Sequence, residues 1–132
     1  YIYDDYWPMS INYWEGIVFI PKRDVWWFGF GVFAEKNGRD MPLDVQWHIH
    51  DEISEQYHFT MMDADKDPVN KWHSIDIREK FDHPPIRVSE GQRIAIKIRP
   101  TDDDRRRTWI GTHGGHNYYS TKEGQDYDFD VK

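Results

Sequence analysis

Three of the seven histidines in this sequence are spaced as metal ligands often are. His48 and His50 lie two residues apart in the alternating stretch Asp44 to Ile53, so both imidazoles would point to one face of a strand. His58, on the next predicted strand, could add a third ligand. The same face of the strand equally fits a polar, solvent-facing surface, because Gln46 lies on it as well. The polar surface is the favoured interpretation, so we predict no metal and no other cofactor, with the histidine site as the alternative.

A glycine-rich segment near the C-terminal end, residues 111–119, has the composition of a recognition loop. Glycines give such a loop conformational freedom, while histidines and tyrosines provide amphipathic contact area at a modest entropic cost. The segment lacks the Lys-Ser/Thr ending of a phosphate-binding loop, and the alternative is a simple hairpin connection. The predicted partner-binding residues are Trp7, Thr112, His113, Gly114, Gly115, His116, Asn117, Tyr118 and Tyr119.

Aromatic residues are concentrated at the start of the chain. They are Tyr1, Tyr3, Tyr6, Trp7, Tyr13 and Trp14. Such a cluster could stack on carbohydrate, but an interface with the rest of the domain or with a neighbouring subunit is the preferred interpretation. We therefore divide the chain into an aromatic arm or first strand, residues 1–14, and a main domain, residues 15–132.

The overall composition excludes several classes of function. The chain has 132 residues, a formal net charge of −7 and no cysteine. The acidic charge argues against a nucleic-acid partner, and the absence of cysteine excludes thiol catalysis and disulfides. No apolar run approaches the roughly 20 residues of a membrane-spanning helix, so we predict no membrane insertion. Because the sequence begins with Tyr1, we expect a processed product or a portion of a longer polypeptide.

Short alternating runs between turn residues predict an all-β protein. No helical periodicity extends over ten residues, and about nine to eleven short antiparallel strands imply a two-sheet, jelly-roll-like β-sandwich. The segment from Ile86 to Ile98 is predicted to be a hairpin that turns at Gly91. The other predicted strands cover residues 17–20, 25–35, 44–53, 57–62, 72–77, 109–112 and 127–131, with an irregular segment at residues 78–85.

The most hydrophobic segment, DVWWFGFGVF, contains two glycines that cost stability inside a strand. If it is extended throughout, Gly29 and Gly31 lie side by side between Trp27 and Phe33. They would form a trough in which a neighbouring backbone or ring can lie close to the strand. The opposite face would then be an unbroken core stripe of Trp26, Phe28, Phe30 and Val32.

Three segments resemble the PHR domain, the β-sandwich module named for the Pam and Highwire proteins and also found in BTB adaptor proteins. They are GFGVF at residues 29–33, HPPIRVSEGQRIAIKI at residues 83–98 and the ending GGHNYYSTKEGQDYDFDV. In this resemblance Gly29, Gly31 and Gly91 are fold-signature residues. The last segment of the family, a Gly-Gln-rich turn into one more strand, has no counterpart after Lys132, so we expect a divergent or truncated member.

The resemblance implies a β-sandwich that binds other proteins and has no catalytic activity, and it favours the cytoplasm for a chain whose compartment is otherwise unknown. We therefore predict a non-enzymatic protein–protein interaction module, part of a larger protein or a structural subunit of a large assembly. The alternatives are a metal-dependent jelly-roll enzyme that uses the His-x-His site and a carbohydrate-binding β-sandwich.

Overall fold

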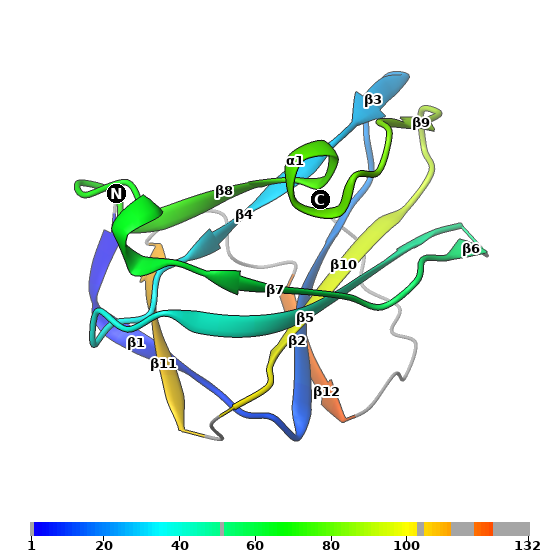
Figure 1. Ribbon diagram of the computed structural model, residues 1–132. Coiled ribbons are helices and arrows are strands. Elements are labelled where there is room, and N and C mark those ends of the chain that lie inside the picture. Colours follow the sequence, from blue (N-terminus) through cyan, green and yellow to red (C-terminus); the bar gives the residue numbers. More distant parts are fainter. Residues whose placement is uncertain (1, 51, 103–104, 112–117, 123–132) are drawn as a thin grey trace.

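A computed structural model describes residues 2–50, 52–102, 105–111 and 118–122 (Figure 1). The described residues form twelve strands, one short α-helix and one 3-10 turn. The elements are β1 (Ile2–Met9), β2 (Tyr13–Phe19), β3 (Val25–Trp27), β4 (Gly29–Phe33), β5 (Met41–Ile49), β6 (Glu52–Ile53), β7 (Tyr57–Met61), η1 (Asp63–Asp65), β8 (Trp72–Asp76), α1 (Ile77–Phe81), β9 (Ile86–Val88), β10 (Ile94–Pro100), β11 (Arg106–Gly111) and β12 (Tyr118–Lys122).

A six-stranded antiparallel sheet is the largest unit. Its order is β12-β2-β10-β5-β6, and β7 pairs with β5 on the same edge as β6. The register places Ile96 of β10 opposite both Ile17 of β2 and Trp47 of β5. These three side chains therefore share one face of the sheet, and this face carries the core.

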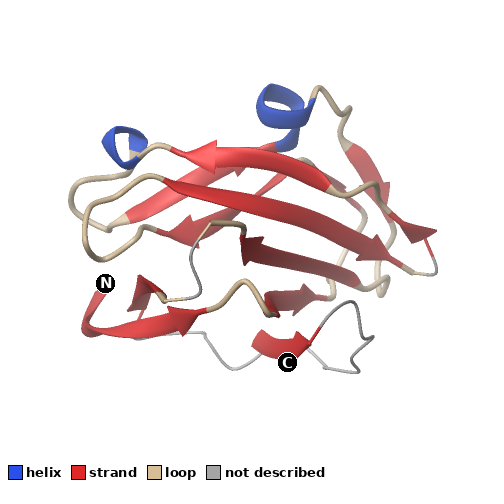
Figure 2. Cartoon of the chain, turned by 60° about the horizontal axis from the view of Figure 1, so that its bottom comes forward, coloured by secondary structure: helices blue, strands red, loops and turns tan. Residues whose placement is uncertain are grey.

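Three two-stranded antiparallel pairs complete the fold: β4 with β8, β3 with β9, and β1 with β11. Figure 2 shows the strands in stacked layers, with both helical segments on the same outer side. This arrangement confirms the predicted all-β antiparallel sandwich. None of the described helices is long or apolar enough to cross a membrane.

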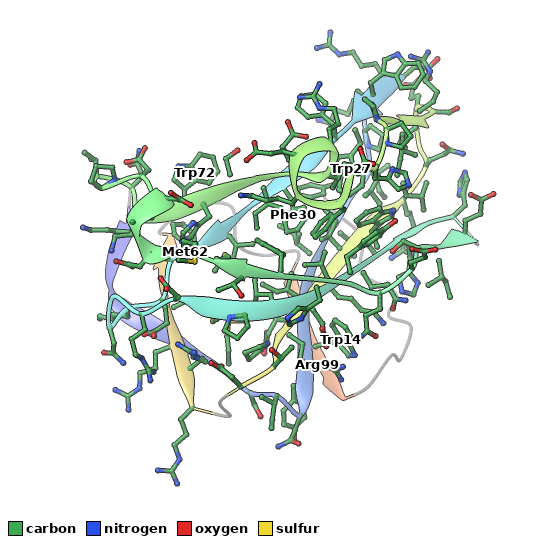
Figure 3. All side chains as sticks on the ribbon, in the orientation of Figure 1. Trp14, Trp27, Phe30, Met62, Trp72 and Arg99 are labelled. Carbon is green, nitrogen blue, oxygen red and sulfur yellow. The ribbon has the colours of Figure 1, made fainter. Side chains whose placement is uncertain are left out.

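The hydrophobic core lies between these layers and follows the alternation in β5. Its inward residues Met41, Leu43, Val45 and Trp47 are buried. The strand predicted at residues 44–53 is misplaced at both ends, because β5 begins at Met41 and ends at Ile49, where the chain turns into β6. Figure 3 shows Trp27 and Phe30 between the upper strands and the six-stranded sheet. Buried contributions from other elements include Val32, Ile75, Ile77, Val88, Ile94 and Ile96.

The predicted strand at residues 25–35 is wrong in one respect, because it breaks at Phe28. The carbonyl of Phe28 accepts a hydrogen bond from the backbone N–H of Ile77 at 2.9 Å, one residue pair beyond the Gly29–Asp76 pairing of β4 and β8. The break separates β3, which pairs with β9, from β4, which pairs with β8. It also shifts the alternation, so that Trp27 is buried while Trp26 and Phe28 face solvent. The predicted core stripe holds only for Phe30 and Val32.

The predicted hairpin at residues 86–98 is also wrong. β9 pairs with β3, whereas β10 pairs with β2 and β5, so the two segments belong to different sheets. The turn between them is real, and Gly91 has the positive φ of 80° that favours glycine. Its N–H donates to the carbonyl of Pro21 at 3.0 Å, which joins this turn to the turn between β2 and β3.

A short helix replaces part of the segment predicted to be irregular. α1 begins at Ile77, and the Asp76 side chain caps it by accepting a hydrogen bond from the N–H of Arg78 at 2.9 Å. A helix of five residues is too short to leave a periodic pattern in the sequence. The strand predicted at residues 127–131 lies outside the described residues.

The structure confirms the predicted role of the trough at the two glycines. A Cβ atom at Gly29 would lie 2.4 Å from the backbone oxygen of Ile75 on the paired strand. At Gly31 it would lie 2.5 Å from the indole ring of Trp72. A backbone and a ring therefore occupy the space that side chains at these positions would need.

Candidate functional site

An open cleft lies where β5, β6 and β7 approach the start of β9. Its volume is about 1040 Å³, just above the roughly 300–1,000 Å³ that is typical of small-molecule pockets. Apolar and polar side chains both contribute to its walls. The lining residues are Trp47, Ile49, His50, Glu52, Ile53, Ser54, Glu55, Tyr57, His83, Ile86, Arg87 and Gln92.

A packed aromatic cluster gives the cleft a rigid wall. The rings of Trp47 and Tyr57 stack with centroids 5.0 Å apart, and Tyr57 stacks on Phe81 at 4.7 Å. The imidazole of His83 meets the Trp47 ring edge-on at 5.4 Å. Aromatic pairs at these separations stabilise one another beyond their burial, so this wall is fixed before any ligand arrives.

Charged groups surround the mouth of the cleft. Glu52 and Glu55 are exposed, and neither carboxylate forms an ion pair with another described residue. Arg87, by contrast, already donates to Asp24 at 3.2 Å. Burial and the nearby Glu55 carboxylate raise the pKa of Tyr57, so the negative field of Glu55 reaches the aromatic wall. The uncompensated charge at the mouth is therefore negative.

Next to the cleft, two large aromatic side chains are exposed on β3 and directly after it. Trp26 is 60% exposed and Phe28 is 44% exposed. The guanidinium carbon of Arg87 lies 5.5 Å from the centre of the Trp26 ring, and that of Arg78 lies 4.1 Å from the Phe28 ring. We name these four residues the aromatic strip. Arg87 belongs to both features, so the strip and the cleft are continuous.

An aspartate holds each arginine of the strip in place. Asp76 accepts two hydrogen bonds from the Arg78 guanidinium, at 3.0 and 2.7 Å, while it also caps α1. The hydrogen bond from the Arg78 side chain is the main cause that lowers the pKa of Asp76 to about 2. Asp24 binds Arg87 and also accepts from the backbone N–H of Glu90 at 2.9 Å. Both arginines of the strip are therefore already engaged by an aspartate before any partner binds.

The other face of the six-stranded sheet carries a different aromatic and charged cluster. Figure 3 shows Trp14 beside Arg99, whose guanidinium carbon lies 4.3 Å from the Trp14 ring centre. Lys97 contacts the same ring, with its amine 4.7 Å from the centre. Arg99 and His58 both contact Asp44, at 3.1 and 3.2 Å. Trp14 and Lys97 are buried, so this cluster stabilises the sheet and offers little contact surface.

The three histidines of the metal alternative do not converge. His58 is paired with Asp44 in the register of β5 and β7, and His48 lies four residues further along β5, roughly 13 Å away. His50 follows the end of β5 in the left-handed region, with φ of 55°, so it is not in the strand row. Within the described part of the chain, no group of three or more histidine or acidic side chains could hold a metal ion.

A buried ion network ties the end of β4 to β11. Glu35 accepts from Arg106 at 3.0 Å and from Arg39 at 2.8 Å, and Asp102 holds the other side of Arg106. Burial alone would lower the pKa of Arg106, but the contacts with Asp102 and Glu35 outweigh it and raise that pKa. Since these charges satisfy one another, we assign this network a structural role.

The residues predicted to bind a partner from the sequence fall in three places. Residues 112–117 lie outside the described residues. Tyr118 and Tyr119 are in strand β12, opposite Ile17 and Gly16 at the edge of the six-stranded sheet. Trp7 is in β1, opposite Thr108 of β11. The aromatic arm thus pairs with the domain, and the proposed boundary at residue 14 falls inside β2. Their roles in binding remain predictions.

Sequence reasoning missed the aromatic strip because it assigned Trp26 and Phe28 to the core. One signal was present in the sequence: Arg87 stands between Ile86 and Val88, so it points away from the core. This outward position of Arg87 identifies Trp26 as exposed only once β9 is known to pair with β3, because that pairing places Trp26 opposite Arg87. That pairing joins residues about sixty positions apart and has no local signal.

Comparison with known protein families identifies the fold and its general class. The PHR domain pattern matches residues 2–132, and the chain therefore belongs to the PHR domain family. The match confirms the resemblance seen in the sequence and supports a domain of the protein-interaction type in general. No curated protein and no solved structure shows a significant match to the chain.

Proposed function

We propose that this chain is a non-enzymatic protein-interaction module whose partner packs against the aromatic strip. The observation that carries this proposal is the exposure of Trp26 and Phe28 beside two arginines that are already held in place. Tryptophan, tyrosine and arginine dominate the energetically important centres of protein interfaces. Two large exposed aromatic side chains only two residues apart on a small domain are typical of such a centre.

Each arginine of the strip already contacts both an aspartate and an aromatic ring, which explains how the strip would bind with little entropic cost. Arg78 and Arg87 are each fixed between an aspartate and an aromatic ring, so their side chains lose little freedom when a partner covers them. The partner would cover the exposed ring surface and exclude water around the ion pairs. In this proposal the module brings its partner to a larger protein or assembly and does no chemistry itself.

The test begins with the identification of a direct partner by cross-linking mass spectrometry on native material. Calorimetry with that purified partner then compares Trp26→Ala and Phe28→Ala with the unchanged chain. Each substitution is expected to weaken binding by about 2 kcal/mol, or about thirtyfold in Kd. Val69→Ala is the control, because Val69 is 75% exposed but lies away from the strip.

The opposite result is equally informative. If both strip variants bind as tightly as the unchanged chain, while alanine at Trp7, Tyr118 and Tyr119 weakens binding, the strip is not the interface. The interface would then lie on the surface predicted from the sequence. Circular dichroism of each variant keeps a loss of binding separate from a loss of folding.

A further inference from the structure

We propose that the cleft beside the aromatic strip binds a lysine or arginine side chain in an extended segment of the partner protein. This inference rests on the proposed interaction function and specifies the chemistry of the partner at a second position. Its three supports are the mixed lining of the cleft, the unpaired carboxylates at its mouth, and its continuity with the strip.

The lining suits the shape of a long cationic side chain. Lysine and arginine have an apolar stem that packs on hydrophobic surface and a charged end that needs a polar partner. The cleft offers Trp47, Tyr57 and Ile86 to the stem and glutamate carboxylates to the charged end. Because the aromatic wall is already packed, the stem would enter without rearranging the core.

The electrostatic balance of the mouth favours a cation. Glu52 and Glu55 have no ionic partner within the described part of the chain, whereas the only arginine in the lining, Arg87, is neutralised by Asp24. A guanidinium or ammonium group placed between the glutamates would form charge-assisted hydrogen bonds. An acidic side chain at the same position would meet two uncompensated carboxylates, so the site discriminates by charge.

The occupant would be a protein segment because the cleft continues into the strip through Arg87. A partner that covers Trp26 therefore has its chain beside the mouth of the cleft. The mouth is also bordered by β6, a two-residue edge strand with an exposed Ile53. An extended segment can lie along this edge while one basic side chain enters the cleft.

Nuclear magnetic resonance titration of the whole chain with short synthetic peptides tests this inference without the natural partner. The probe is an acetylated and amidated Gly/Ser peptide with two arginines. Matched peptides replace arginine with lysine, with uncharged citrulline or with glutamate. Amide shifts are expected at residues 52–55 and at the indole N–H of Trp47 with the basic peptides. The citrulline peptide is expected to bind about tenfold more weakly, and the glutamate peptide not at all.

The variant Glu52→Gln/Glu55→Gln should reduce affinity for the basic peptides about tenfold and abolish the difference between arginine and citrulline. Glu79→Gln is the matched control, because Glu79 is an exposed carboxylate on α1 outside the cleft lining. Both cleft glutamates are exposed, so the double variant should stay folded, and its nuclear magnetic resonance spectrum without peptide checks this.

Three results would each overturn the inference. The first is equal binding of the arginine and glutamate peptides, the second is a loss of affinity for the basic peptides with Glu79→Gln as large as with the double variant, and the third is the absence of any shift at the cleft residues. Free arginine is added as a further probe, and equal affinity for free arginine and for the arginine peptide would overturn the assignment to a protein segment. None of these results affects the Trp26→Ala and Phe28→Ala measurements with the natural partner. The two proposals can therefore fail separately.

Discussion

The segments 25–28 and 29–33 are consecutive and almost equally apolar, yet they present their side chains in opposite ways. In the first, Trp27 is buried while Trp26 and Phe28 are exposed and covered in part by arginines. In the second, Val32 points into the core and the two glycines admit the neighbouring strand. The first segment forms the proposed contact surface, and the second closes the fold.

A single break in the strand separates these roles. At Phe28 the backbone carbonyl bonds to the start of α1, and the alternation shifts by one residue. Because side chains alternate with a period of two, such a shift exchanges the buried and exposed sets. Hydrophobicity alone therefore does not distinguish an exposed aromatic surface from a core stripe.

The largest expected effect concerns two neighbouring tryptophans. Trp27→Ala should lower the free energy of unfolding by about 3–5 kcal/mol, because Trp27 is buried against Trp47 at a ring separation of 5.3 Å. Trp26→Ala should cost less than about 1 kcal/mol, because most of its ring is already in water. Urea denaturation followed by circular dichroism measures both. Equal losses would mean that the break at Phe28 does not reverse the faces.

Gly29→Ala should be the next most destabilising change, by about 2–3 kcal/mol. The new methyl group would meet the backbone oxygen of Ile75 at 2.4 Å, and the paired strand must move to admit it. The same urea denaturation provides the measurement. A Gly29→Ala protein of unchanged stability would contradict the close approach of β4 and β8.

Gly31→Ala should cost less, about 1–2 kcal/mol, since the obstacle is the side chain of Trp72 and its ring is partly exposed. In a Trp72→Ala background the added cost of Gly31→Ala should disappear. The double-mutant cycle measures this coupling. Gly29→Ala serves as the control, because truncation of Trp72 should leave its cost unchanged. Additive losses at Gly31 and Trp72 would show that the ring does not fill the trough.

The smallest expected effect is a pH dependence at the strip. Since Asp76 has its pKa lowered from 3.8 to about 2, its ionised form stabilises the fold above about pH 4. That contribution is lost as the pH falls from about 4 to about 2, where the unfolded chain binds the proton first. Carbon-detected titration should find the low pKa, and Arg78→Ala should return it towards 3.8. A pKa near 3.8 in the unchanged chain would contradict the Arg78 contact.

Much of the fold was predictable because it depends on local pattern. The alternation from Asp44 to Ile49 determines which side chains in that part of β5 face the core, and the glycines at 29 and 31 indicate a close approach. The PHR resemblance also rests on short local motifs. Strand pairing was less predictable, as the false hairpin at residues 86–98 shows. Alternation specifies the faces of a strand but not its neighbour.

The candidate site was the least predictable part. Trp47 lies in the alternating stretch that the sequence marks as a strand, but its contacts with Tyr57, Phe81 and His83 join three separate segments. The exposure of Trp26 depends likewise on the distant Arg87. Nothing in the sequence near Trp26 distinguishes it from Trp27.

The sequence by itself determined that this chain is an acidic, cysteine-free, all-β domain of the PHR family, because composition, alternation and turn residues act locally. Only the tertiary structure decided which aromatic residues became surface and which became core. The pairing of β3 with β9 and that of β4 with β8 made that choice. Both are contacts between residues far apart in the chain, whose free energy depends on packing that no local pattern contains.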